Sequence, residues 1–160
     1  MTHMEQLICE FLDWQGYIVK SNFCVGKRAA GGWEMELDIV AYHHATKHLV
    51  QYEPSIDALS WQKRLQRYEK KFKAGKTYIF TEVFPWLPPD TELHQIAVFI
   101  SHPRGRDTIA GGKLVSVDEM MAEVRNKVIQ NGPMYKNAIP ERYPLLRTIQ
   151  MVQCGYYKLL

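Results

Sequence analysis

The spacing of apolar residues predicts a helix at the start of the chain and strands after it. Between residues 2 and 14, apolar side chains recur every three or four positions and so share one helical face. Thr2 is suited to cap this helix and Gly16 to end it. Alternating apolar residues then predict strands over residues 17–25, 34–42 and 48–53.

The rest of the chain continues the mixture of helices and strands. A buried stripe of Trp61, Leu65, Tyr68 and Phe72 predicts a helix over 60–73, capped by Ser55 or Ser60 and ended at Gly75. Runs of β-branched and aromatic residues predict strands over 77–84 and 95–100. A capping box at 116–119 opens a helix that ends at Asn131, and residues 144–153 form a last helix. With no repeat or linker, the order predicts one α/β domain over 1–160, with a mixed sheet flanked by helices.

Composition adds a candidate binding surface. The hydrophobic fraction of 46% and charged fraction of 23% are typical of a soluble globular protein. The net charge of +3 is small, but residues 61–76 hold seven lysines and arginines against the single acid Glu69. Such a helix is either a solvated face or a surface that contacts phosphates.

Three widely spaced cysteines indicate reduced thiols in a cytoplasmic protein rather than disulfides or a zinc site. No run approaches the roughly 20 apolar residues of a membrane span, so we expect no membrane partner.

Two acids on neighbouring strands are the candidate chemistry. Asp38 precedes the apolar run 39–41 and is predicted to be buried, where a carboxylate needs a partner or a metal. Glu53 ends the next strand, which the hairpin 43–47 brings back about 4.8 Å away. The two carboxylates are therefore expected to converge and to be able to share a divalent cation. Glu34 and Glu36 are predicted on the same strand face as Asp38, and Gln51 on the same face as Glu53, unless it is an ordinary polar strand residue.

The segment 36–41, the hairpin, and the segment Leu49-Val50-Gln51-Tyr52-Glu53-Pro54-Ser55 together resemble the PD-(D/E)XK nuclease superfamily. The resemblance covers roughly residues 2–82 and implies the restriction-endonuclease-like fold. It implies a magnesium-dependent or manganese-dependent nuclease acting on DNA phosphodiester bonds, with Asp38 and Glu53 as metal ligands. Glu5 in the first helix matches the family's early glutamate, with Glu10 as second choice. Family members often work as dimers, so a homodimer is a further expectation.

The sequence departs from the family at Ser55, where the family has a lysine that stabilises negative charge in the transition state. The lysine role has either moved to Lys63 or Lys71 on the next helix, or been lost. Its loss would leave a catalytically silent DNA-binding or complex-forming subunit; a third alternative is a small-molecule-binding domain with purely structural acids. The catalytic candidates are therefore Glu5, Asp38, Glu53, Ser55 and Lys63. The DNA-binding candidates are Lys63, Arg67, Lys70 and Lys71.

Overall fold

Six strands form one mixed sheet in the computed structural model, which describes residues 1–57 and 59–155. The strands are β1 (Ile18–Lys27), β2 (Trp33–His43), β3 (His48–Ser55), β4 (Leu93–Phe99), β5 (Thr108–Ile109) and β6 (Gly112–Ser116). Their order across the sheet is β1-β2-β3-β4-β6-β5. The first three strands form an antiparallel meander, while β3, β4 and β6 run parallel. The carboxyl ends of the central parallel strands therefore lie at one edge of the sheet.

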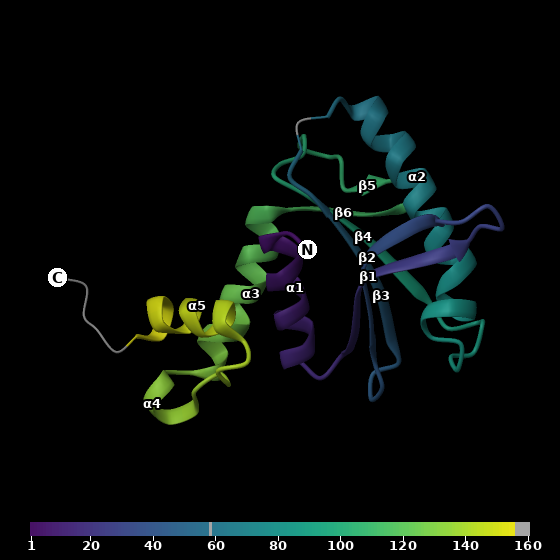
Figure 1. The fold of residues 1–160 in the computed structure, drawn as a ribbon. Helices are drawn as coiled ribbons and strands as arrows, with labels where there is room; N and C mark the ends of the chain where they lie inside the picture. The colour runs from purple at the N-terminus through teal and green to yellow at the C-terminus, as the bar shows by residue number, and fades with distance from the viewer. Residues whose placement is uncertain (58, 156–160) are drawn as a thin grey trace.

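Helices cover both faces of this sheet (Figure 1). The helices α1 (His3–Trp14), α3 (Val117–Asn131) and α5 (Pro144–Cys154) pack on one side, with the short α4 (Met134–Asn137) beside them. The other side carries α2 (Trp61–Tyr78) and the π-helical turn η1 (Ile79–Val83). The predicted single α/β domain with a mixed sheet flanked by helices is thus the observed architecture.

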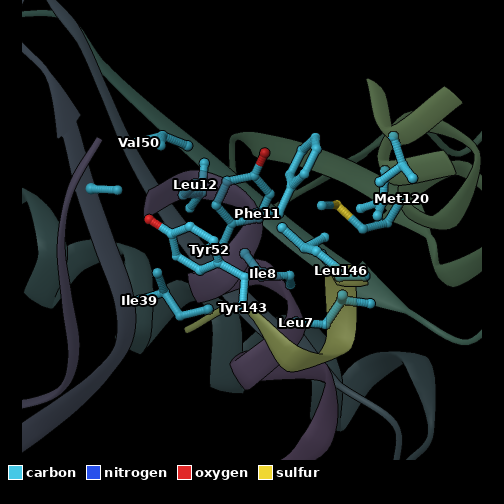
Figure 2. Packing of buried hydrophobic residues seen from close by; sticks show 14 of the residues in the cluster. Leu7, Ile8, Phe11, Leu12, Ile39, Val50, Tyr52, Met120, Tyr143 and Leu146 are labelled. Atoms are coloured by element: carbon cyan, nitrogen blue, oxygen red, sulfur yellow. The ribbon is translucent and has the colours of Figure 1, made fainter. Parts of the chain in front are cut away.

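The larger core lies under α1. Figure 2 shows Ile8 and Phe11 of α1 packed against Tyr52 of the sheet, with Met120 and Leu146 closing the cluster from α3 and α5. A fully buried side chain of this size contributes about 1.5–3 kcal/mol. Smaller clusters join α2 and η1 to the opposite face of the sheet. Among the described residues, no helix is both long and apolar enough to cross a lipid bilayer.

Two predicted helix starts are confirmed by their caps. Thr2 and Glu5 form a reciprocal capping box on α1, and Ser116 and Glu119 form another on α3. Hydrogen bonds from Ser116 and His102 lower the pKa of Glu119 to about 2. Capping at both positions follows from local sequence alone, because each box spans only four residues.

The predicted strand over residues 77–84 is wrong. This segment completes α2 and continues as η1, in which the amide of Phe84 donates to the carbonyl of Ile79 at 2.8 Å. Ile79 and Val83 are four residues apart and face the core together, so burial overrides the strand propensity of these residues. Gly75 consequently lies inside α2 and does not end it. Strands β5 and β6 and helix α4 were not predicted.

The strands around the acids also differ in detail from the prediction. Strand β3 continues through Pro54 to Ser55, both paired with β4. Along β2 the side-chain alternation is interrupted, because Leu37 packs with Val40 on the α2 side while Ile39 packs on the α1 side. Asp38 therefore does not simply continue the face that carries Glu34 and Glu36.

Glu10 joins the first and last described helices. Its carboxylate accepts hydrogen bonds from the backbone amides of Leu145 at 2.9 Å and Leu146 at 3.3 Å, at the start of α5. A carboxylate at a helix N-terminus satisfies free amides and interacts favourably with the helix dipole. Glu10, the second choice for a catalytic glutamate, thus has a structural role.

We expect Glu10→Ala to lower the free energy of unfolding by about 1–2 kcal/mol, the usual range for a lost helix cap. Chemical denaturation measures the change, with Glu123→Ala on the exposed face of α3 as the control. Equal stabilities of the two variants would contradict the capping role.

Candidate active site

Asp38 and Glu53 face each other across β2 and β3. The antiparallel register pairs Ile39 with Tyr52, so one further step places Asp38 opposite Glu53. The backbone amide of Asp38 donates to Oε1 of Glu53 at 3.4 Å. Both side chains are largely buried, Glu53 completely. The structure therefore brings together the two acids that the sequence singled out.

Lys71 lies between these two carboxylates. Its ammonium donates to Oδ1 of Asp38 at 2.7 Å and also to Oε2 of Glu53. Lys71 comes from the third turn of α2, whose apolar neighbours Tyr68 and Phe72 pack into the sheet and carry the lysine with them. The Tyr68 hydroxyl adds a bond to the backbone carbonyl of Glu53 at 2.8 Å.

Burial and the neighbouring charges shift the pKa values of Glu53 and Lys71. Burial raises the pKa of Glu53 to about 8, with Asp38 adding to the rise and Lys71 opposing it. Burial lowers the pKa of Lys71, but the two facing carboxylates more than offset that effect and leave its pKa above the ordinary value. Lys71 is thus held as a buried ammonium.

Two glutamines extend the cluster along the sheet. Gln51 donates to Oε1 of Glu53 at 2.8 Å, and Gln95 on β4 donates to Oε1 of Gln51, also at 2.8 Å. The parallel register pairs these two glutamines directly. Gln51 lies on the same face of β3 as Glu53, as the sequence predicted. Gln95 was missed, since its role depends on β3 and β4 being neighbours, which no local pattern reveals.

A small pocket of about 190 Å³ opens beside Asp38. Glu5, Ser55, Asp57 and Arg67 also line it. The Ser55 hydroxyl donates to Oδ2 of Asp57 at 2.6 Å, and Arg67 pairs with the same oxygen at 2.7 Å. Ser60 occupies the N-cap position of α2 without a side-chain hydrogen bond, and Ser55 does not cap the helix either. The carboxylate of Glu5 accepts from the backbone amide of Thr2 at 2.8 Å.

The basic residues of α2 divide into two groups. Lys63 and Lys70 are exposed, and Arg67 is exposed but paired with Asp57. Lys71, also predicted to contact DNA, is buried against the acids instead of lying on that face. The exposed basic residues lie near the pocket, because Arg67 belongs to them and also lines the pocket.

The carboxylate oxygens of Asp38 and Glu53 are suitable ligands for a magnesium ion that needs few protein ligands. Magnesium is commonly held by one or two carboxylates, with water and phosphate oxygens completing its shell. Asp38 and Glu53 provide such a pair, and Asp38 also borders the open pocket. Within residues 1–57 and 59–155, no three His, Cys, Asp or Glu side chains gather closely enough to hold a metal. Glu5 therefore lines the pocket without completing a three-acid cluster.

No protein-family model matches the chain, and neither a curated protein nor a solved structure matches it.

Proposed function

We propose that this protein is a magnesium-dependent nuclease with a restriction-endonuclease-like fold that hydrolyses DNA phosphodiester bonds. The observation that carries the proposal is the Lys71 ammonium held between Asp38 and Glu53, of which Asp38 lines an open pocket. An acid pair with a lysine is the constellation that the resemblance to the PD-(D/E)XK superfamily implies. Here the lysine comes from α2, whereas Ser55 occupies the sequence position at which family members carry the lysine.

In this proposal Asp38 and Glu53 would hold the magnesium ion, which when bound would act as a Lewis acid on the scissile phosphate. Lys71 keeps a positive charge beside the same phosphate and offsets negative charge that develops there. Ser55 and Arg67 line the pocket; there Arg67 is suited to a phosphate oxygen and Ser55 to orienting a water. Lys63 takes no part in the chemistry and, with Lys70, contacts the DNA backbone.

The deciding experiment is cleavage of plasmid and branched DNA in Mg²⁺ and in Mn²⁺. We expect Asp38→Asn to reduce cleavage at least about 100-fold, because a lost metal ligand removes several kcal/mol of transition-state stabilisation. Asp90→Asn, an exposed aspartate outside this site, is the control. Equal cleavage by wild type and Asp38→Asn would defeat the proposal. DNA binding without cleavage by the wild type would favour the silent DNA-binding subunit.

The proposed DNA contacts predict a salt dependence. Each phosphate contact contributes about −0.9 to the slope of log affinity against log salt. Replacing Lys63 and Lys70 by alanine should flatten that slope by about 1.8 if each makes one contact. Arg67 is left in place because its pair with Asp57 supports the pocket. Fluorescence anisotropy over a salt series measures the slope, with Lys127→Ala on α3 as control; an unchanged slope would make this helix an ordinary solvated face.

A further inference from the structure

The side-chain amides of Gln51 and Gln95 form a buried hydrogen-bond chain that ends at Glu53. Gln51 is fully buried and Gln95 nearly so, at 0% and 6% exposure. A buried amide is destabilising unless its donors and acceptor are paired. Here the pairing forms a chain that runs from β4 through β3 to the carboxylate of Glu53.

The direction of this chain is fixed by backbone carbonyls of α2. The amide nitrogen of Gln95 donates to the carbonyl of Phe72 and to Oε1 of Gln51, both at 2.8 Å. Both partners are acceptors, so Gln95 must present its NH₂ group to them. The carbonyl oxygen of Gln51 consequently faces Gln95, and its NH₂ group faces Glu53 and the carbonyl of Lys71.

The shape of α2 preserves this arrangement. At Gly75 a Cβ atom would lie 1.9 Å from Oε1 of Gln51, so only glycine leaves room for the amide. The chain therefore depends on both hydrogen bonding and a close helix–strand contact. An ordinary polar strand residue would need neither this chain of hydrogen bonds nor the close contact with Gly75.

We propose that Gln51 and Gln95 are positioning residues, which act in series to hold the Glu53 carboxylate toward Asp38 and Lys71. Oε1 of Glu53 is held by Gln51 and the amide of Asp38, which leaves Oε2 for Lys71. Without Gln51 the carboxylate loses the shorter of the two hydrogen bonds to Oε1 that set its rotation. The consequence for cation binding and catalysis rests on the proposed function, whereas the orientation of Glu53 does not.

The test compares Gln51→Met, Gln95→Met and the double variant, because methionine keeps the side-chain length and removes the donor. We expect Gln51→Met to weaken Mn²⁺ binding, measured by electron paramagnetic resonance, by about 10–100-fold, as for other partners of metal-binding carboxylates. The kcat for DNA cleavage should fall by a similar factor while KM for DNA stays unchanged. Gln95→Met should have a smaller effect, and the double variant no larger effect than Gln51→Met, since the two act in series.

A metal-free crystal structure of Gln51→Met provides the independent readout. We expect the Glu53 carboxylate to have turned away from the Asp38 amide; Gln130→Met, exposed on α3, is the control for methionine substitution itself. A Glu53 carboxylate that keeps its position would overturn the proposal, as would unchanged Mn²⁺ affinity in a wild type that binds Mn²⁺. If the wild type neither binds Mn²⁺ nor cuts DNA, the proposed function fails, and the crystal structure alone decides the positioning role. Should Gln51→Met not fold, Gln95→Met is crystallised in its place, with a displaced Gln51 amide as the expected result and an unmoved one overturning the relay.

Discussion

Replacing Lys71 by methionine should reduce metal-dependent DNA cleavage by on the order of 10²–10³-fold, the effect of removing one well-placed charge-stabilising group. Lys71 is the ammonium that contacts both acids. Lys63→Met on the exposed part of the same helix is the matched control and should leave kcat unchanged. A Lys71→Met enzyme that cuts like the wild type would remove the lysine from the mechanism.

The same substitution should lower the free energy of unfolding by about 3–5 kcal/mol, because it leaves buried carboxylates without their cation.

This loss of stability has a pH dependence whose sign follows from the pKa of Glu53. Burial raises the pKa of Glu53 to about 8. Between the ordinary pKa of a glutamate and that value, the folded protein keeps a proton that the unfolded chain has released. Stability from this group therefore falls as pH rises through that interval. Without Lys71 the pKa of Glu53 rises further, so the deficit should be larger at about pH 9 than at about pH 5. Urea denaturation at the two pH values measures it, and a pH-independent deficit would point to lost packing instead.

Gly75→Ala should destabilise the protein by roughly 1–3 kcal/mol, the usual range for overpacking a buried site. The sign is informative, because glycine to alanine within a helix ordinarily stabilises by about 0.5–1 kcal/mol. The new methyl group would meet the Gln51 amide, which three hydrogen bonds hold in place. Thermal and urea unfolding measure the change.

Two further variants separate this clash from other causes. Lys73→Ala, exposed on the same helix, should be near neutral. Shortening Gln51 to alanine should remove the obstacle, so the double variant Gln51→Ala/Gly75→Ala should be more stable than the sum of the single changes implies. Additive changes would mean that the methyl group and the amide do not meet.

Much of the fold follows from local sequence. The two capping boxes and the three-strand meander depend on short-range patterns, and these were predicted within a few residues. Residues 77–84 were not, because a segment rich in β-branched and aromatic residues is also apolar at helical spacing, and only its packing on β2 decides between the two.

The candidate site divides along the same line. The convergence of Asp38 and Glu53 could be predicted, because both lie on one hairpin whose register is determined by its short turn. Lys71 and Gln95 belong to elements that approach the acids only in three dimensions. The sequence named Lys71 as one of two lysines, and the way α2 sits on the sheet distinguishes it from Lys63, one side chain being buried and the other exposed.

The separate origins of acids and lysine bear on how the chain folds. The hairpin of β2 and β3 closes a short loop, so it can form early and bring two negative charges together while both are still hydrated. Lys71 is 33 residues from Asp38 and 18 from Glu53, and reaches them only when α2 docks. Loss of water from the carboxylates and arrival of their counter-ion must then coincide. A nascent chain whose α2 has not yet emerged from the ribosome therefore carries the acid pair without the lysine, and acquires the complete triad only on docking.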